Sequence, residues 1–349
     1  FMGQDAASRR HHCRNTNVGR NYTSTFEMTK EKTIKTLKII GIPVFVGLII
    51  RFLFDVDDWN SLWRLMTITF FISLPYVVGA LTIYLSDYNK IKSLGYRIFC
   101  PWVPIFVFFI LTLILSIEGW ACWIMILPIF LFFSSLGGVT AGYFKLKKTR
   151  QANTLHLSLA ILLPFFIGPI ENLIGEIPGF YKAYTYIDIE APKDKIWSNV
   201  TRVREIKETE DQGQLTNFLQ IPRPIRAELN YEGIGAKREA IFEGGLIFDE
   251  TVLKYKHEEL MNFSIRPNTY EIPSTTFDEH ILIGGEFFDV LEGTYELEEI
   301  GQNKYRLHLY SKFKLTTTFN FYASFWGQWI MSDIQENILK VIKKRSEVV

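Results

Sequence analysis

Four long apolar runs in the N-terminal half constrain this chain more than any other feature of its sequence. Almost every stretch from Leu37 to Ile170 is apolar, whereas charged residues return at ordinary density from Glu171 onward. A helix needs about 20 apolar residues to cross the hydrocarbon core of a bilayer. The four runs are Leu37–Phe54, Leu62–Leu85, Tyr96–Ile117 and Trp120–Phe144. Because the segments between them are short, we expect a bundle of transmembrane helices rather than the buried helices of a large soluble protein.

A fifth apolar run, Leu155–Ile170, is shorter and contains Pro164, Gly168 and Pro169. This composition is compatible with a fifth span, with a helix in the membrane interface or with a re-entrant segment, and we favour a span. In the first four runs, no Asp, Glu, Lys or His lies near the middle. Transporters coupled to protons or ions usually need such groups, so we expect the bundle of four or five helices to act as an anchor or scaffold.

Basic residues between the runs predict the orientation of the bundle. Four lysines lie before or at the start of the first run, three basic residues lie between the second run and the start of the third, and four separate the fourth from the fifth. The other two connections, 55–61 and 118–119, contain no Lys or Arg. Because cytoplasmic loops carry the excess of Lys and Arg, we expect an integral protein of the inner or plasma membrane with a cytoplasmic N-terminus. A spanning fifth run places the C-terminal domain outside the cytoplasm, which is the interpretation that we favour.

The charge balance excludes one class of partner. The 349 residues contain 38 Lys and Arg against 37 Asp and Glu, a formal net charge of +1, whereas a nucleic-acid-binding protein needs a basic face. His11, His12 and Cys13 are a weak pattern for a metal site, so no metal and no cofactor are predicted. The predicted domains are 1–28, a disordered polar tail; 29–177, the transmembrane bundle; and 178–349, a soluble domain.

The soluble domain begins with a strand and a helix and continues with several strands. A strand is predicted over Lys182–Ile189, a helix opens after Ala191-Pro192, where proline suits the first helical position, and a short helix is expected within Arg202–Gln212. The later strands are separated by glycine-containing turns, which is a hairpin pattern. These strands are predicted at 227–231, 238–243, 247–255, 287–297 and 304–315.

The end of the chain defines the expected fold. The strand 304–315 alternates cleanly and predicts a sheet with one buried and one wet face. The closing helix is predicted over Trp326–Lys344. Its apolar stripe is Trp326, Ile330, Ile334, Ile338 and Val341. A helix of this kind packs its apolar face on a sheet, so we expect an α+β helix-grip domain, with a curved antiparallel sheet around a long C-terminal helix and a cavity between them.

Arg238 and Glu250 are the sharpest polar candidates. They lie on two predicted strands joined through Gly244-Gly245, and a three-residue loop pairs Phe242 with Phe248 and Ala240 with Glu250. We prefer this register to that of a two-residue loop because it places both phenylalanines on one face. Arg238 and Glu250 then share that face. A buried charge needs a partner, so the two are predicted to orient the polar head of a ligand, or else to form a structural ion pair or a solvated rim.

This order of elements resembles the START-like superfamily, also called SRPBCC, polyketide-cyclase-like or helix-grip, over residues 184–346. The resemblance is carried by YIDIEAPKDKIWSNV, by a middle block with GIGAKR, FEGG and FDE, and by the closing FWGQWIMSDIQENILKVIKKRSE. It is similar to a membrane-linked bacterial branch with an N-terminal helical bundle. The resemblance implies binding of lipids, sterols, polyketides or other apolar ligands; a minority of members are cyclases or hydrolases. Ser332 and Gln335 stand where related sequences are expected to carry histidines, which makes histidine chemistry there doubtful.

The predicted function is a membrane-anchored domain that binds a hydrophobic or lipid-like small molecule in a cavity between the sheet and the C-terminal helix. The candidate cavity residues are Arg238, Glu250, Phe242, Phe248, Trp197, Tyr305, Trp326 and Trp329. No catalytic residue is assigned. Two alternatives stay open: a cyclase- or hydrolase-like enzyme, with Glu279 and His280 in a loop over the cavity mouth, and a structural or sensory protein with a closed cavity. The expected partners are membrane lipids and the small molecule, and the oligomeric state is left unassigned.

Overall fold

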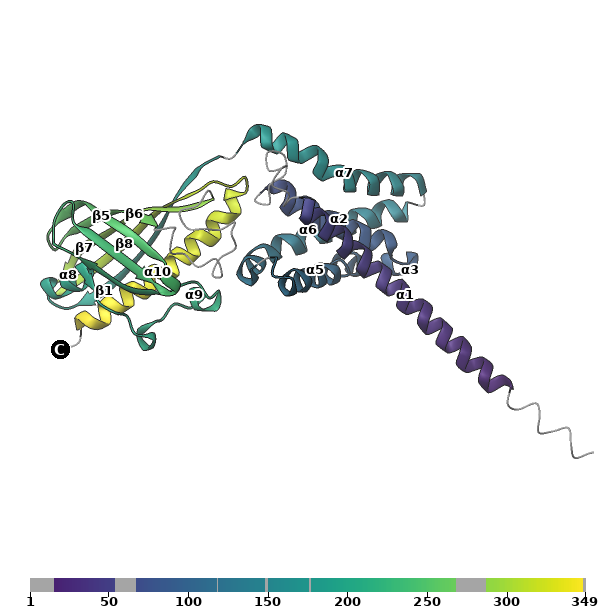
Figure 1. Cartoon of the computed structure of the whole chain (residues 1–349), viewed down its shortest axis with the longest axis horizontal. Coiled ribbons are helices and arrows are strands. Elements are labelled where there is room, and N and C mark those ends of the chain that lie inside the picture. Colours follow the sequence, from purple (N-terminus) through teal and green to yellow (C-terminus); the bar gives the residue numbers. More distant parts are fainter. Residues whose placement is uncertain are drawn as a thin grey trace, which may run out of the picture. The chain divides into compact units, whose positions relative to one another are not determined.

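The computed structural model describes residues 16–53, 67–117, 119–147, 150–175, 177–267 and 287–347. Its contacts divide the chain into two units, which are described in turn (Figure 1). The first unit holds most of the apolar helices. The second holds an eight-stranded sheet with its accompanying helices, together with short stretches at the ends of some apolar helices. The domain limits that we place at 29–177 and 178–349 stay a prediction.

Seven helices precede the sheet in the described part of the chain. They are α1 (Thr16–Leu53), α2 (Ile68–Leu85), α3 (Tyr88–Ile91), α4 (Leu94–Phe99), α5 (Trp102–Ile114), α6 (Trp120–Leu146) and α7 (Arg150–Ile174). Helix α1 differs from the prediction of a disordered tail over 1–28, because it already begins at Thr16. The segment 16–28 contains no proline. Once the apolar part of the helix has formed, the helix extends easily toward the N-terminus, because each added residue gains one backbone hydrogen bond. Residues 1–15, including the histidine pair, lie outside the described residues.

Four helical stretches are long and apolar enough to cross a membrane, by length and composition. They are Lys30–Leu53, Ile68–Leu85, Leu94–Ile114 and Trp120–Leu146. The third is interrupted between α4 and α5 at Pro101, which has no backbone N–H to donate. The fifth predicted run lies within α7, and its apolar part, Leu157–Glu171, is shorter than the other four. Its crossing of the membrane therefore stays a prediction, as does the orientation of the bundle.

Glycines let two of the apolar helices approach closely. A Cβ atom at Gly79 of α2 would lie 1.9 Å from the Ser134 carbonyl oxygen of α6. A Cβ atom at Gly137 of α6 would lie 2.1 Å from the Tyr76 carbonyl oxygen of α2. Both distances are far below van der Waals contact, so any larger residue would force the helices apart. Small residues at helix contacts are typical of membrane bundles, where close packing replaces the hydrophobic effect as the attractive force.

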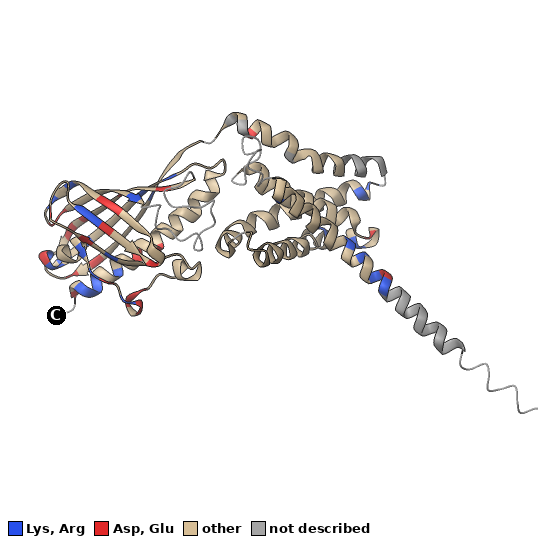
Figure 2. Cartoon of the chain, viewed as in Figure 1, with Lys and Arg blue, Asp and Glu red and all other residues tan. Residues whose placement is uncertain are grey.

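Charged side chains satisfy both ends of helix α2. At its start the Glu171 carboxylate accepts hydrogen bonds from the backbone N–H groups of Ile68, at 2.7 Å, and Thr69, at 2.8 Å. At its end the Lys145 ammonium donates to the carbonyl oxygens of Tyr84 and Ser86, each at 2.6 Å. These charges have the signs that complement the helix dipole. In α1 the charged residues Lys30, Glu31, Lys32, Lys35 and Lys38 lie instead partway along the helix, before its most apolar part (Figure 2).

The second unit is built on one antiparallel sheet with strand order β1-β8-β7-β6-β5-β4-β3-β2. The strands are β1 (Gly179–Glu190), β2 (Arg202–Val203), β3 (Pro224–Leu229), β4 (Lys237–Phe242), β5 (Ile247–Lys256), β6 (Leu260–Pro267), β7 (Phe288–Gly301) and β8 (Lys304–Leu315). In the described part of this unit, three α-helices accompany the sheet: α8 (Lys193–Thr201), α9 (Leu215–Phe218) and α10 (Asn320–Glu347). The sheet is strongly curved, and α10 packs against β1, β8, α8 and α9 (Figure 1). The predicted sheet around a long C-terminal helix is present.

The short helix predicted within Arg202–Gln212 is confirmed only as a single 3-10 turn. Arg202 already lies in β2, and only one 3-10 turn, Glu208–Glu210, follows before Gln212. The backbone N–H of Ile206 donates to the carbonyl of Ile225 at 2.7 Å, which holds the segment beside β3. A tertiary hydrogen bond has therefore overridden the local helical tendency of a charged stretch.

Strand β8 confirms the predicted alternation, whereas α10 turns a different face to the sheet. Tyr305, Leu307, Leu309, Phe313 and Leu315 are all buried. On α10 the buried residues include Met331, Gln335, Leu339, Ile342 and Ser346. Of the predicted stripe only Val341 is buried, and Trp326, Ile330, Ile334 and Ile338 lie partly exposed beside the contact.

Gln335 explains why the face of α10 was mispredicted. Its side-chain oxygen accepts a hydrogen bond from the Thr185 hydroxyl of β1 at 3.0 Å, and its amide nitrogen donates to the Ser311 hydroxyl of β8 at 2.7 Å. All three side chains are buried. A buried polar group is tolerated when it is hydrogen-bonded, so a glutamine occupies the centre of a helix face that a hydropathy pattern assigns to solvent. The polar contact fixes α10 against the sheet edge.

Candidate functional site

Arg238 and Glu250 lie side by side on the inner face of the sheet. The register pairs Arg238 of β4 directly with Glu250 of β5, and the same row continues to Leu229 of β3 and Ile265 of β6. Directly opposite residues of an antiparallel pair point to the same face. Leu229 is part of the hydrophobic core and Ile265 packs against it, so both charged side chains point into the interior of the domain.

The register of this hairpin is two residues away from the predicted one. The β4–β5 connection contains a 3-10 turn at Glu243–Gly245, where Gly244 and Gly245 adopt φ angles of 72° and 84°. Only glycine visits this region readily. The longer connection makes Ala240 pair with Phe248 and not with Glu250.

A shift of two residues leaves every side chain on its predicted face, because side chains alternate with a period of two. The prediction that Arg238, Glu250 and the two phenylalanines share one face is therefore confirmed. The rings of Phe242 and Phe248 meet edge to face, with their centroids 5.2 Å apart. This geometry is favourable for aromatic pairs.

The ion pair is buried but incompletely hydrogen-bonded. Arg238 and Glu250 are 5% and 6% exposed, and Nη1 of the arginine lies 3.3 Å from Oε2 of the glutamate. Among the described residues, no group forms a hydrogen bond with Nε or Nη1 of Arg238 or with Oε2 of Glu250. Native proteins leave few buried polar atoms in this state, and each one that remains calls for an explanation, such as a catalytic role or a bound water or ion.

Two aromatic rings flank the guanidinium. Its central carbon lies 5.2 Å from the ring centroid of Phe263 and 5.7 Å from that of Tyr295. Cations are attracted to the faces of such rings. Gly293, which pairs with Phe263, makes room for the phenyl ring, because a Cβ atom there would lie 2.4 Å from it. The glycine thus helps to hold the ring beside Arg238.

Burial controls the protonation of the pair. Removal from water disfavours the carboxylate and raises the pKa of Glu250 to about 7, although the nearby Arg238 charge acts in the opposite direction. Burial also disfavours the guanidinium, but the attraction of Glu250 and of Tyr295 outweighs it, so the pKa of Arg238 lies above its ordinary value. Near neutral pH, Glu250 is therefore able both to accept and to donate a proton while Arg238 stays charged.

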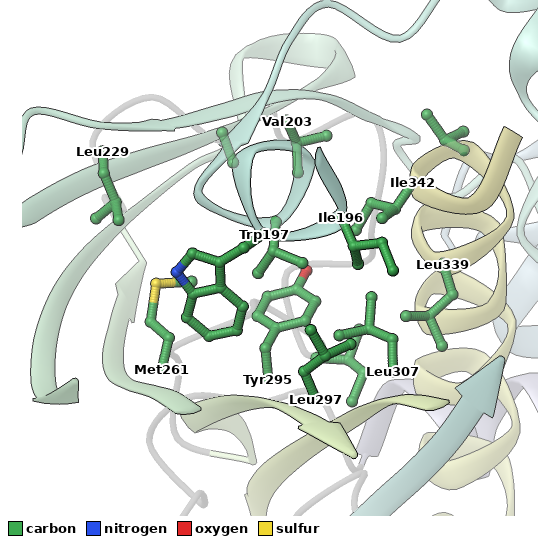
Figure 3. Close-up of a cluster of buried hydrophobic side chains, with 14 of the residues drawn as sticks. Ile196, Trp197, Val203, Leu229, Met261, Tyr295, Leu297, Leu307, Leu339 and Ile342 are labelled. Carbon is green, nitrogen blue, oxygen red and sulfur yellow. The ribbon is translucent and has the colours of Figure 1, made fainter. Parts of the chain in front are cut away.

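An apolar interior surrounds the inner face of the sheet. Trp197 of α8, Met261 of β6, Leu307 of β8 and Leu339 of α10 converge there with Tyr295 (Figure 3). The indole Nε1 of Trp197 donates a hydrogen bond to the Tyr255 hydroxyl at 3.0 Å, so the one polar atom of this ring is satisfied. The cluster is rich in rings and branched side chains, which are the lining typical of sites for apolar ligands.

The predicted site residues separate into two groups. Arg238, Glu250, Phe248, Trp197 and Tyr305 are buried in the interior, and Phe242 packs against the same cluster. The two tryptophans of α10 lie elsewhere. Trp326 is partly exposed and stacks on Trp329 with the ring centroids 5.4 Å apart, and Trp329 is 48% exposed. The true phase of α10 turns these two rings away from the helix face that Gln335 and Leu339 present to the sheet.

Sequence reasoning missed the residues of β6 and β7 that flank the pair. Phe263 and Tyr295 are buried and contact Arg238, yet no strand was predicted over 260–267. The alternation of Met261, Phe263 and Ile265 was the signal that would have found β6. Glu279 and His280 lie outside the described residues. Among the described residues, no group of three His, Cys, Asp or Glu side chains is arranged to hold a metal ion.

Comparison with known proteins finds likenesses to solved structures and none to families. No family model matches the chain, and no curated protein matches it. Norcoclaurine synthase from Thalictrum flavum, solved in complex with dopamine and hydroxybenzaldehyde, has a TM-score of 0.29 at 11% identity and covers 49% of this chain and 87% of its own. Major latex-like protein 151 from Panax ginseng has a TM-score of 0.31 at 10% identity, with coverages of 48% and 99%. A protein from Arthrobacter aurescens has a TM-score of 0.28 at 13% identity, with coverages of 47% and 86%. Likenesses this remote leave the activity of this chain open.

Proposed function

We propose that the C-terminal unit binds an amphiphilic small molecule between its sheet and α10, and that the apolar helices anchor it in a membrane. One observation carries the proposal: a charged pair lies on the inner face of the sheet with hydrogen-bonding atoms that no described residue satisfies. The ligand's polar head engages Arg238 and Glu250, and its apolar part lies against the surrounding rings and aliphatic side chains. Membership of the START-like superfamily is part of this proposal.

The chemistry of the pair limits the head group. Arg238 offers N–H donors at Nε and Nη1, and Glu250 offers an acceptor at Oε2, or a donor when it is protonated. A head group with an acceptor and a donor side by side, such as an amide, a hydroxyl or a carboxylic acid, satisfies both. Leaving a buried polar atom unmatched costs about 1–3 kcal/mol, so each new hydrogen bond contributes to affinity by removing that cost.

Apolar contacts supply the rest of the binding energy. Burying apolar surface is worth about 25 cal/mol for each Å², so a tail that buries roughly 200 Å² contributes about 5 kcal/mol. Tethering the domain to a bilayer adds a concentration effect, because an amphiphile dissolved in the membrane stays close to the binding unit. This combination of a polar anchor, an apolar interior and a membrane tether is the reason to propose a lipid-like ligand.

Native mass spectrometry of the full chain tests the proposal. The protein is extracted in mild detergent and its complexes are weighed after the detergent is removed. We expect one amphiphile bound to each chain, and we expect a lipid extract that contains this amphiphile to stabilise the sheet unit. A ligand present at 100 times its Kd raises the free energy of unfolding by about 2.7 kcal/mol. Absence of any bound amphiphile, together with an unchanged thermal midpoint in lipid extract, would contradict the proposal.

A second candidate function rests on the pKa of Glu250. A carboxyl group that titrates near pH 7 beside a fixed positive charge is suited to general acid–base chemistry, and the pKa of Glu250 is raised to about 7. A hydrolase of this kind adds one water and splits its bound molecule into two smaller products, and a cyclase that closes a ring by condensation releases one water, so either changes the mass of the bound molecule. Following the mass of the co-purified molecule during incubation distinguishes the two functions, because a binding protein leaves that mass unchanged and Glu250→Gln slows only an enzyme.

The membrane arrangement proposed with this function has a cytoplasmic N-terminus and a C-terminal unit outside the cytoplasm. It is supported by the alternation of Lys and Arg between the apolar runs. Protease added to sealed cells is expected to cleave the C-terminal unit and to spare the N-terminus. Protection of that unit, with cleavage only after the cells are opened, would place it in the cytoplasm.

A further inference from the structure

The first half of α10 presents an aromatic face that is not part of the interior. Phe321, Phe325 and Trp329 follow one another at intervals of four, which places them on one side of the helix. They are 76%, 58% and 48% exposed. The rings of Phe325 and Trp329 contact each other, with 5.9 Å between their centroids, and Trp326 stacks on Trp329. We call these three residues the aromatic face.

Charge is distributed unevenly along this helix. No charged residue occurs between Lys314 and Asp333, whereas the second half of α10 carries acidic and basic side chains along its length (Figure 2). An ordinary amphipathic helix carries charges on its solvent side throughout. The first half of α10 is therefore built for contact with an apolar medium, and the second half is built for water.

The aromatic face lies at the end of the unit where the chain arrives from α7. Helix α7 ends at Ile174 and β1 begins at Gly179, so the two elements lie at most about 18 Å apart along the extended connection. The Asn320 side chain at the start of α10 donates a hydrogen bond to the Ile177 carbonyl in this connection, at 2.7 Å. Ile177 itself is exposed. The first turn of α10 is thus held close to the C-terminal end of an apolar helix.

We propose that the aromatic face docks into the headgroup region of the lipid bilayer. Three observations select this occupant: the short connection to an apolar helix, the absence of charge in the first half of α10, and the combination of Phe and Trp, which is typical of the buried face of helices that lie in the membrane interface. The docking rests on the proposed membrane anchoring. It fixes the end of the sheet unit at the bilayer surface, so an amphiphile reaches the domain without crossing water.

A fluorescence experiment on the full chain in vesicles tests the docking. The three native cysteines are replaced by alanine, one new cysteine is introduced as Phe325→Cys, and an environment-sensitive dye is attached to it. The vesicles contain phosphatidylcholine with a nitroxide near the top of the acyl chain. The matched control is Glu336→Cys, an exposed position in the charged half of the same helix. Phe106→Cys in α5, an exposed position within a candidate span, reports the membrane anchoring itself.

Docking predicts at least threefold more quenching at position 325 than at position 336, with strong quenching at position 106. Phe321→Cys is expected to behave like Phe325→Cys, which guards against an effect of one substitution. Equal quenching at 325 and 336, with position 106 still quenched, overturns the docking and leaves the anchoring intact. A dye at 325 that is shielded from water but not quenched shows a protein neighbour, such as a second copy, and also overturns it. No quenching at position 106 overturns both.

Discussion

Two arginine–carboxylate pairs bridge neighbouring strands of the same sheet, and they differ in almost every physical respect. On the inner face, Arg238 and Glu250 meet at 3.3 Å and are nearly inaccessible to water. On the outer face, Arg306 of β8 and Asp188 of β1 are about one-third exposed and form two hydrogen bonds, at 2.7 and 3.1 Å. Burial raises the pKa of Glu250, whereas the hydrogen bond from Arg306 lowers the pKa of Asp188.

The difference shows that the outer pair adds a little to the stability of the fold, whereas the inner pair lowers it. The outer pair is hydrogen-bonded and solvated, so it adds a little stability and needs no ligand to satisfy it. The inner pair takes two charges out of water and leaves some of their hydrogen-bonding atoms unmatched, which makes it costly for folding. This cost, together with the position of the pair in an apolar interior, is the reason for our proposal that Arg238 and Glu250 bind the head group of a ligand.

The largest expected effect comes from breaking the inner pair. Removing one partner of a buried pair leaves an uncompensated charge and costs about 3–5 kcal/mol, so Arg238→Ala is expected to lower the thermal midpoint of the sheet unit by roughly 10 °C. The double substitution Arg238→Met with Glu250→Leu is expected to restore or exceed the original midpoint. Differential scanning fluorimetry of the full chain measures both. A double variant that is as unstable as the single one would show that the pair stabilises the fold.

A pH titration provides the next effect. The pKa of Glu250 is raised from 4.5 to about 7, so the folded state holds the proton more tightly than the unfolded state. Stability contributed by protonated Glu250 is therefore present below pH 4.5 and is lost as the pH rises to about 7, by about 3 kcal/mol at 1.36 kcal/mol for each pH unit.

The control is the difference between the wild type and Glu250→Gln, measured as thermal midpoints from pH 4.5 to 8. The wild type is expected to lose stability relative to the variant over this range. Asp188 behaves oppositely: its lowered pKa gives stability that is lost only as the pH falls below its ordinary value of 3.8. Parallel curves for the wild type and Glu250→Gln would contradict a buried carboxyl group that titrates near neutrality.

A smaller effect is expected from Gly293→Ala. The added methyl group would lie 2.4 Å from the Phe263 ring, so the ring must move away from Arg238, and overpacking of this kind costs about 1–3 kcal/mol. Gly301→Ala at the other end of β7 is the matched control, because its new Cβ meets the Lys304 side chain at an ordinary 3.6 Å. We expect the thermal midpoint to fall only for Gly293→Ala. Equal decreases for both variants would contradict the role of Gly293 in holding the Phe263 ring beside Arg238.

The outer pair is expected to give the smallest effect. Arg306→Ala removes an exposed ion pair and a guanidinium that lies 4.5 Å from the Tyr186 ring, and exposed pairs contribute about 0.2–1 kcal/mol. The change in thermal midpoint should shrink further in 0.5 M salt, because salt screens exposed charges. A large, salt-independent loss would show that the two faces of the sheet do not differ in the way described above.

The sequence predicts where elements begin and end better than it predicts strand register or the face that a helix packs against the sheet. The alternation in β8 and the Ala-Pro before α8 were sufficient to place those elements, because both signals are local. The register of the β4–β5 hairpin was missed by two residues, since two adjacent glycines with positive φ lengthen the connection. The face of α10 was missed because Gln335 is buried by hydrogen bonds to β1 and β8, and such contacts are visible only when the strands are in place.

The candidate site was predicted in part for the same reason. The face shared by Arg238 and Glu250 follows from the period of two along each strand, so its prediction is correct although the predicted register is wrong by two residues. Phe263 and Tyr295 come from strands distant in sequence, and their approach to Arg238 depends on the curvature of the whole sheet. Trp329 was assigned to the interior from its residue type alone, and the phase of α10 places it outside.

Ligand retention by pair variants tests the central claim most directly. The wild type, the inner double variant Arg238→Met with Glu250→Leu, and the outer double variant Arg306→Met with Asp188→Leu are purified identically and weighed by native mass spectrometry. If the inner pair holds the head group of an amphiphile, the inner variant folds at least as stably as the wild type yet loses the bound molecule, and the outer variant keeps it. Equal retention by all three proteins would contradict the claim.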